Sequence, residues 1–524
     1  MRGGVNGARR AWAARRAFGV ELQAKTPLIF AATTAHELPL NGNALRAPFS
    51  TGKRGKVASA AAPAAEGGDE VLPGAFKSPI TQALWEIRRA EMKFQETRRE
   101  AGGKTPSENL RAVPPSLSRS AIHYPFSTDS FLREDYRNPS GLVRIGRILE
   151  DLDALAGNIA FKHCSEDPSF PLLVTASVDR IVLKRHPQLD CDMTLMGRVV
   201  WTGRSSMVIN MRCSSSPPGV CYVGGDLGAD DDNCWLDANF TFVARDRETG
   251  RSRAVSPLTL GGNPLQKTPG DIVGDSGTKE TDPEDGWRAI WRVVQTHKDR
   301  QALERKAAKE GTGHEKFSEL EAARAKREQE ATKLVAAGFP LQHLPALADP
   351  HAVLVRQTAV SSTLICMPQH RNTANRIFGG FLMHRAYEVA FCAAFMFGGS
   401  RPRFSEIDEV VFLQPVDVGD LVHLEACVLY TKPGKDSNSP PEACVEVLAS
   451  VVRPEAVESK VSNRFNLTFS FPELAAGKNA SQDGSSSAVV LRTVLPADAT
   501  EASRIVMAKH KDRFQDAADE AARS

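Results

Sequence analysis

The sequence lacks several features that would assign it to a well-known class of protein. No window approaches eighteen consecutive apolar residues, so we expect no membrane-spanning helix. The nine cysteines form no Cys-x-x-Cys pair and show no Cys/His spacing typical of metal ligands. This favours reduced packing thiols over disulfides or a zinc site. Because Gly-x-Ser-x-Gly does not occur, a hydrolase with a nucleophile elbow is excluded.

Strong charge of one sign is also absent. The formal net charge is only +3, and no cluster of Lys and Arg alternates with aromatic residues. We therefore expect no nucleic-acid partner. The 524 residues leave room for two to four domains, and contents of 41% hydrophobic and 25% charged residues are ordinary for a soluble globular protein.

The N-terminal region predicts a targeting segment. The first twenty residues contain five arginines and no acid, which is typical of an organelle transit peptide, although a disordered basic tail has the same composition. We expect the mitochondrial matrix as destination, with a plastid as second choice. Residues 1–75 are assigned to this peptide and a disordered sequel, and residues 76–130 to a helical or irregular lead-in with a helix over 78–100.

Two stretches each predict a helix followed by strands. Residues 145–157 form an amphipathic pattern, and the stretch 371–397 becomes apolar on almost every face. The strand-like segments are 172–183, 192–203, 205–213 and 238–246, then 406–416, 421–431, 443–453 and 462–471. The other expected segments are an insertion over 214–234, a solvated helical connector over 287–335, and a C-terminal helix over 501–520 capped by Thr500.

The two halves repeat one another in spacing. The matched spacings are Asn138 to Ile145 with Asn372 to Gly379, and Asp179 to Thr202 with Asp408 to Thr431. A helix followed by antiparallel strands, occurring twice, predicts an α+β fold made of two helix-on-sheet units. The expected boundaries are 131–262 for the first unit, 263–354 for a charged helical linker, 355–475 for the second unit and 476–524 for a C-terminal tail.

Motifs in both halves resemble the hotdog-fold acyl-CoA thioesterases, in the type that carries two hotdog folds in one chain. They are PQHRNTANRIFGGFLM (368–383), FGGSRP (397–402) and FLQPVDVG (412–419), with ILEDLDALAG (148–157) and TASVDRI (175–181) in the first half. The resemblance implies tandem hotdog folds, each an antiparallel sheet wrapped around a long central helix. It also implies hydrolysis of acyl-CoA to fatty acid and CoA, no metal and no cofactor, and a trimer of tandem chains.

The resemblance further implies a site built from an Asn of one hotdog and a helix acid of the other. By position the acid is Asp153 in the first half, but Tyr387 in the second. We therefore predict one composite site per chain, with Asp153 as general base, Asn372 orienting water or the thioester carbonyl, and the Gly380 N–H as oxyanion donor. Direct attack by the carboxylate stays open, as does Glu388 as a second acid.

Helical geometry gives Asp153 an independent argument. The residue lies at the margin of the apolar face, near Gly146 and Gly157, which would leave room for a substrate. Asp151 points the opposite way and is interpreted as a solvated helix acid. Plain structural alternatives exist for Asp153, as a solvated acid, and for Asn372, as a turn or cap residue.

CoA carries phosphates, so we expect cationic groups near the site. By analogy with hotdog proteins that hold CoA near such turns, the candidates are Arg204 and Ser205, with a counterpart around Lys432 and Lys435; an ordinary hairpin turn is the alternative. Structural roles are expected for the lone histidines His163, His370 and His384.

Two other functions stay open. Residues 135–140, DYRNPS, are partly similar to the Asp-x-Asn-Pro-x-His element of a hotdog hydratase or dehydratase, but Ser140 replaces the histidine. Tyr387 and Ile145 would also fit a non-catalytic acyl-CoA-binding protein whose sites have decayed.

Overall fold

The structure is a computed structural model. It describes residues 78–100, 110–165, 171–187, 189–218, 233–246, 249–259, 294–295, 298, 314–372, 376–408, 410–434, 439–475 and 491–523. The predicted transit peptide, its disordered sequel, the first part of the connector helix and Lys435 lie outside these residues. Across the described part of the chain, no helix is long and apolar enough to cross a membrane.

The first half is built on a long buried helix, α5 (Ile145–His163), which continues six residues beyond the predicted end because residues 158–161 are still buried. The predicted lead-in helix, α2 (Pro79–Glu100), packs along α5 and buries Ile80, Leu84 and Trp85. The other lead-in elements are α3 (Pro115–Ser118), β1 (Ser120–Tyr124) and α4 (Ser130–Asp135). The lead-in thus belongs to the packed core of this half.

Four strands follow α5 where the sequence pattern predicts them. They are β2 (Leu172–Leu183), β3 (Asp192–Thr202), β4 (Ser206–Ser216) and β5 (Cys234–Arg245). The expected insertion is narrower than 214–234, because Ser214 pairs with Cys234 across β4 and β5. Both ends of that segment therefore extend the strands.

The second half repeats the plan. Its long helix α8 (Gly379–Gly398) begins only at the glycine pair, and residues 371–372 and 376–377 precede it as non-helical chain. The predicted strand over 406–416 is instead two short strands, β8 (Arg403–Ile407) and β9 (Val410–Phe412), since β12 (Glu458–Ser470) pairs separately with each. The remaining strands are β6 (Ala352–Leu354), β7 (Val360–Ile365), β10 (Leu421–Lys432), β11 (Glu442–Arg453) and β13 (Thr493–Leu495).

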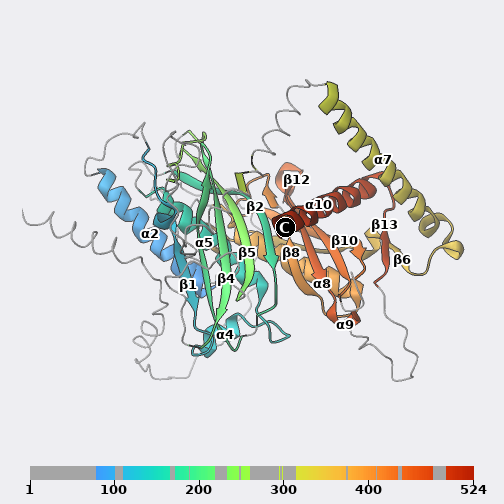
Figure 1. Ribbon diagram of the computed structural model, residues 1–524, viewed down its shortest axis with the longest axis horizontal. Helices are drawn as coiled ribbons and strands as arrows, with labels where there is room; N and C mark the ends of the chain where they lie inside the picture. Colours follow the sequence, from blue (N-terminus) through green and yellow to red (C-terminus); the bar gives the residue numbers. More distant parts are fainter. Residues whose placement is uncertain are drawn as a thin grey trace, which may run out of the picture.

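Two further helices pack together beside the second half: α7 (His314–His343), with most of its described residues exposed, and α10 (Ala499–Arg523) (Figure 1). The predicted cap Thr500 is wrong. Asp498 stands just before the helix, and its Oδ1 accepts the N–H groups of Thr500 at 2.8 Å and Glu501 at 2.9 Å. Short elements complete the fold: η3 (Pro345–Leu347), η4 (Val355–Thr358), η5 (Pro368–His370), η6 (Pro454–Ala456) and α9 (Pro472–Ala475).

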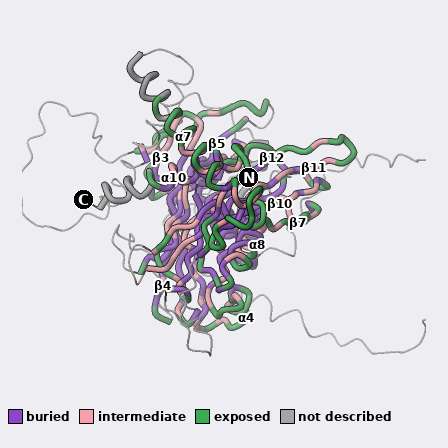
Figure 2. Tube along the Cα trace, turned by 90° about the vertical axis from the view of Figure 1, so that its right-hand side faces the viewer, coloured by how far each residue is buried: buried purple, intermediate pink, exposed green. Residues whose placement is uncertain are grey.

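The strand order is the same in both halves. It runs β1-β3-β4-β5-β2 in the first and β7-β10-β11-β12-β8 in the second, and β2 pairs with β8 to join them into one eleven-stranded sheet (Figure 1). The named pairings around α5 and α8 are antiparallel, so the α+β class is confirmed. Each long helix packs on the strands of its own half, and the two helices pack against each other. Buried residues gather in the middle of the molecule (Figure 2).

Candidate active site

A hydrogen bond joins the two halves at the predicted site. The backbone N–H of Gly380, in the first turn of α8, donates to Asp153 Oδ2 at 2.7 Å. The first N–H groups of a helix lack partners within it, and the N-cap residue Phe378 offers no side-chain acceptor. Asp153 therefore caps α8 from the opposite half, where the helix dipole favours negative charge. The structure thus brings two of the three predicted catalytic residues together.

Burial tunes the acidity of Asp153. The residue is 4% exposed, and its Oδ1 accepts the hydroxyl of Thr175 on β2 at 2.9 Å. Loss of solvation raises the pKa of Asp153 to about 6, against the lowering effects of the hydrogen bonds from Thr175 and Gly380 and of the charge of Arg88. A carboxylate with this pKa is mostly deprotonated at neutral pH and still basic enough to take a proton from water.

Gly379 keeps a close approach to the carboxylate possible. A Cβ at this position would lie 2.9 Å from Asp153 Oδ2 and 3.2 Å from the ring of Phe412 on β9. Any larger residue would therefore press on the carboxylate or the ring. The first glycine of the pair leaves the space in front of the acid to a small group such as water or a thioester carbonyl.

The expectation that Gly146 and Gly157 leave room for a substrate is wrong. A Cβ on Gly157 would overlap the guanidinium of Arg88, and one on Gly146 would overlap the ring of His384. The space beside Gly157 is filled by a side chain of the lead-in helix, and the space beside Gly146 is filled by a side chain of the other half.

Asn372 lies in the loop that leads into α8. Its N–H donates to the Arg376 carbonyl at 2.6 Å, and its Oδ1 accepts the Arg376 N–H at 3.1 Å. Asn138 holds the matching loop before α5 in the same way, through the carbonyl of Leu142 at 2.8 Å and its N–H at 3.0 Å. Both asparagines thus form a turn, and Asn372 is not among the described hydrogen-bond partners of Asp153.

The matching position of the second half holds no acid. Tyr387 packs against Phe404 of β8, with ring centroids 5.6 Å apart at an interplanar angle of 81°. Burial raises the pKa of Tyr387 well above its ordinary value. Phe404 occupies the place of Thr175, since each lies four residues before the matched aspartates Asp408 and Asp179. Two aromatic rings therefore replace the acid and its hydroxyl donor.

Glu388 is held by basic groups. Its Oε1 lies 3.2 Å from Arg144 Nη2 and 3.1 Å from His384 Nε2, and its Oε2 lies 2.7 Å from Arg385 Nη1. Burial alone would raise the pKa of Glu388, but the hydrogen bond to His384 and the charges of His384 and Arg385 lower it to about 2. Such a carboxylate is a weak proton acceptor, so these contacts favour an ion-pair role over that of a second base.

Asp151 is fully buried, and its interpretation as a solvated helix acid is wrong. It accepts the hydroxyls of Ser78, of Thr81 at 2.8 Å, of Tyr124 at 3.1 Å and of Tyr136. Burial raises its pKa to about 6, although the hydrogen bonds from Ser78, Tyr136 and Thr81 act to lower it. Asp151 therefore fastens α2 and β1 to the face of α5 that helical geometry alone left open to solvent.

A buried ion pair supports the crossing of the two helices. His384 Nδ1 lies 2.9 Å from Glu150 Oε1, and the two residues are 4% and 6% exposed. Burial lowers the pKa of His384, but the hydrogen bonds and charges of Glu150 and Glu388 outweigh it, so the net shift is upward. The pair lies beside the candidate site, since a Cβ on Gly380 would lie 2.9 Å from the Cα of Glu150.

The turn with Arg204 and Ser205 lies at the same end of the sheet as Thr175. One row of paired residues crosses from β2 to β3 through Thr175, Phe242, Met207 and Thr202. Three strand spacings of about 4.8 Å put the turn roughly 14 Å from Thr175. Arg204 is exposed, whereas Lys432 lies 2.6 Å from Asp512 and is engaged in an ion pair.

Thr175 and Arg88 contribute to the site, although neither was predicted as a site residue. Thr175 lies in the TASVDRI motif, whose alternating pattern marks a strand but does not show which helix acid it meets. Arg88 lies in the polar lead-in helix, and its Nη2 donates to the Ala154 carbonyl at 2.9 Å. Only the packing of α2 on α5 brings that charge near Asp153.

The fold and the site define an α+β protein whose two halves share one buried carboxylate at a helix N-terminus. Over 438 residues the chain is 40% identical to "Acyl-coenzyme A thioesterase 4, mitochondrial" of Humulus lupulus, which covers 83% of this chain and 73% of that protein. It is 41% identical over the same length to "Acyl-coenzyme A thioesterase 2, chloroplastic" of that plant, covering 83% and 89%. The chain belongs to the acyl-coenzyme A thioesterase family, as its motifs predicted.

More distant similarities extend to animals and bacteria. "Acyl-coenzyme A thioesterase 9, mitochondrial" of Mus musculus is 30% identical over 374 residues, covering 69% of this chain and 74% of that protein. A solved acyl-CoA hydrolase of Staphylococcus aureus in complex with butyryl coenzyme A is 20% identical with a TM-score of 0.27, covering 33% of this chain and 94% of that chain. No family model matches the chain.

Proposed function

We propose that the chain hydrolyses acyl-CoA thioesters to a fatty acid and CoA at one composite site between its halves. The observation that carries this proposal is the hydrogen bond from Gly380 of the second half to Asp153 of the first. It puts a buried base at a helix N-terminus, where an N–H donor and the dipole favour an oxyanion. The substrate class follows from the relatives, which are acyl-coenzyme A thioesterases.

In the proposed reaction, the Gly380 N–H changes its hydrogen-bond acceptor. A thioester carbonyl oxygen takes over this donor and frees Asp153 Oδ2, while Thr175 keeps the carboxylate oriented. Asp153 accepts a proton as water attacks the carbonyl carbon, and negative charge develops on the oxygen at the start of α8. Asn372 orients the water or the thioester. The C–S bond then breaks, and the proton passes to the CoA thiolate.

The finer architecture belongs to the same proposal. The repeated strand order supports two tandem hotdog domains joined by the linker 263–354. The first domain begins before the predicted boundary at residue 131, because β1 belongs to its sheet, and the second is proposed to span residues 355–475. The aromatic pair Tyr387–Phe404 in place of an acid and hydroxyl supports one working site per chain. We further propose a trimer of tandem chains in an organelle, with the mitochondrial matrix ahead of a plastid, consistent with relatives named mitochondrial and chloroplastic.

Release of free CoA thiol from short-chain and long-chain acyl-CoA tests this function directly. The full chain is expected to turn over at least one of these substrates. Binding of acyl-CoA without thiol release would overturn the proposal in favour of a binding protein. Consumption of an enoyl-CoA by hydration, again without thiol release, would point to a hydratase.

Hydrolysis is expected to depend on pH through Asp153. Because the base must be deprotonated and its pKa is raised to about 6, kcat/KM should fall as pH drops through that value and level off above it. Steady-state kinetics from about pH 5 to about pH 8 would show this limb. A kcat/KM that stays constant across the range would contradict Asp153 as the base.

Arg204→Ala is expected to raise KM for acyl-CoA about three- to tenfold with little change in kcat, because one exposed cation contributes roughly 1 kcal/mol to phosphate binding. Arg185→Ala is the matched control. Arg185 is also exposed but follows the far end of β2 from Thr175. Equal KM values for the two variants would remove Arg204 from the proposed CoA contact.

A further inference from the structure

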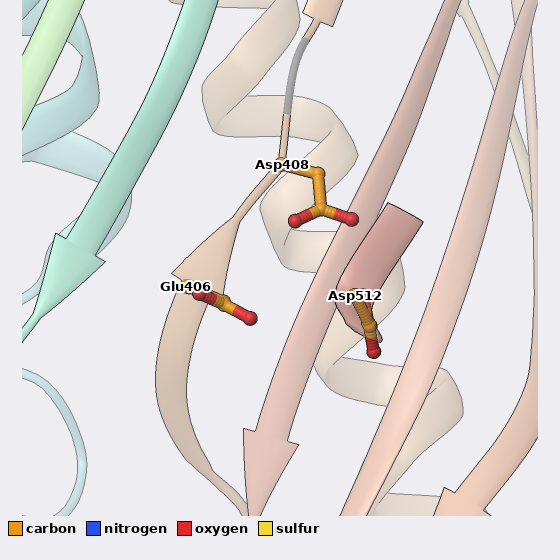
Figure 3. Close-up of side chains that lie close together, drawn as sticks. All are labelled: Glu406, Asp408 and Asp512. Atoms are coloured by element: carbon orange, nitrogen blue, oxygen red, sulfur yellow. The ribbon is translucent and has the colours of Figure 1, made fainter. Parts of the chain in front are cut away.

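Three carboxylates converge where α10 packs on the sheet of the second half. Glu406 on β8, Asp408 just beyond it and Asp512 on α10 each offer an oxygen, and these oxygens lie within 4.8 Å of one another. Figure 3 shows the Asp408 carboxylate pointing toward the other two. Asp408 is 1% exposed and Asp512 is 4% exposed. Carboxylates this close and this buried require a positive charge or a proton between them.

Glu406 and Asp512 have basic partners. Glu406 Oε2 lies 2.6 Å from Arg180 Nη2, an ion pair that also links the two halves. Asp512 Oδ2 lies 2.6 Å from Lys432 Nζ and accepts the hydroxyl of Tyr430. The outer oxygens of the cluster are therefore neutralised from the sides by one arginine and one lysine.

Asp408 differs from its two neighbours in its hydrogen bonds, although the charges of Lys511 and Arg180 act on it. Among the described residues, neither of its carboxylate oxygens has a hydrogen-bond donor, and Oδ1 of Asp512 has none either. Asn466 lies on the neighbouring strand β12, and its backbone carbonyl accepts the Asp408 N–H at 3.0 Å. The side-chain oxygen of Asn466 is also buried without a donor. The cluster is thus rich in acceptors that the described side chains leave unsatisfied.

The first half has an aspartate at the equivalent position, but its hydrogen bonds are satisfied. Asp179 matches Asp408 in the repeat, and it is satisfied by donors: Ser177 at 3.0 Å, Thr241 at 3.1 Å and the Lys298 ammonium at 3.5 Å. By the same spacing Glu406 replaces Ser177, two residues before the aspartate. The second half has therefore exchanged a donor for an acid around an aspartate that remains buried.

We propose that Glu406, Asp408 and Asp512 form a binding site for a hard divalent cation such as Ca²⁺, with Asn466 as a further oxygen ligand. Carboxylate and amide oxygens are the ligands such cations prefer. The three carboxylates each offer an oxygen within 4.8 Å of the others, which is close enough for one cation to be shared among them. The cation would tie α10 to β8, the strand that joins the halves through β2.

The test measures cation binding by the full chain and by Asp408→Asn, which keeps the shape and removes the charge. Isothermal titration with Ca²⁺ should show one site per wild-type chain, and Tm should rise on the order of 5 °C at about 100 times Kd. Asp408→Asn should lose both effects. The matched control Asp179→Asn should keep both, because it changes the equivalent aspartate of the first half.

A proton on Asp408 is the competing explanation, and pH separates the two. Burial raises the pKa of Asp408 to about 7. The charges of Glu406 and Asp512 add to this rise, whereas the charges of Lys511 and Arg180 oppose it. Folding then takes up a proton below that pH, so the unfolding free energy of cation-free protein should fall as pH rises from about 4 through 7. A bound cation should abolish this dependence.

Three results would overturn the site: no Ca²⁺ uptake by wild type at millimolar concentration, binding by Asp408→Asn equal to wild type, or a Tm that follows pH and ignores the cation. Should Asp408→Asn fail to fold, Ca²⁺ binding and Tm are measured for Asp512→Asn and for wild type with and without a chelator, which decides the same question. Hydrolytic activity is not the readout, so failure here leaves the proposed catalytic site intact.

Discussion

Asp153→Asn is expected to lower kcat for acyl-CoA hydrolysis about 10²- to 10⁴-fold, the usual contribution of a general base. The asparagine keeps the volume of the side chain and can still accept the Gly380 N–H, while its amide can donate to the Thr175 oxygen. Above pH 6 the variant also removes a buried charge whose pKa is raised. Its Tm should therefore equal or exceed that of wild type, and KM should change little.

Two other acids of the same helix pair serve as controls. Asp151→Asn disturbs a carboxylate that accepts four hydroxyls, so Tm should fall while kcat of the folded enzyme stays near wild type. Glu388→Gln should leave kcat largely unchanged, since Glu388 serves an ion pair. Full activity in Asp153→Asn would reject the site, and activity lost in Glu388→Gln but kept in Asp153→Asn would move the base to the other half.

The repeat explains why so much of the fold could be predicted. Matched spacings around Asn138 and Asn372, and around Asp179 and Asp408, indicate two copies of one plan, and the strands follow period-two patterns that local sequence carries. The pairing of Asp153 with the start of α8 could be predicted because the family resemblance implies a site shared by the two halves, and the repeat shows that Tyr387 replaces the acid in the second copy.

Burial from elsewhere in the chain could not be predicted. Asp151 and Asp153 point to opposite sides of α5, as helical geometry requires. The side that carries Asp151 is covered by α2, a helix whose sequence is largely polar. Likewise Gly157 has Arg88 against it. In both cases an element about seventy residues earlier in the chain fills the space, and a single-sequence pattern does not reveal such long-range packing.

His384→Ala is expected to cause the largest loss of stability. The change removes the imidazole that lies 2.9 Å from the Glu150 carboxylate, a residue only 6% exposed, and it opens a void beside Gly146. Breaking a buried pair by removing one partner costs about 3–5 kcal/mol of unfolding free energy, and Tm should fall on the order of 10 °C. Chemical and thermal denaturation would measure both.

The pH dependence separates this charge effect from simple cavity formation. The folded pKa of His384 is raised above its ordinary value of 6.5, so its charge stabilises the fold fully below that pH and the contribution is lost as pH rises through the folded pKa. The difference between wild type and His384→Ala should therefore shrink at alkaline pH. A cavity alone would leave the difference constant.

Stability and catalysis should be coupled at this crossing. Glu150 and His384 lie on the two helices whose relative position sets the Gly380–Asp153 hydrogen bond, and the Cα of Glu150 is packed against Gly380 itself. His384→Gln, whose amide can still donate to Glu150, should recover part of Tm and of kcat, whereas His384→Ala should lose both. If His384→Ala folds with unchanged Tm and kcat, the ion pair does not set the register of the two helices.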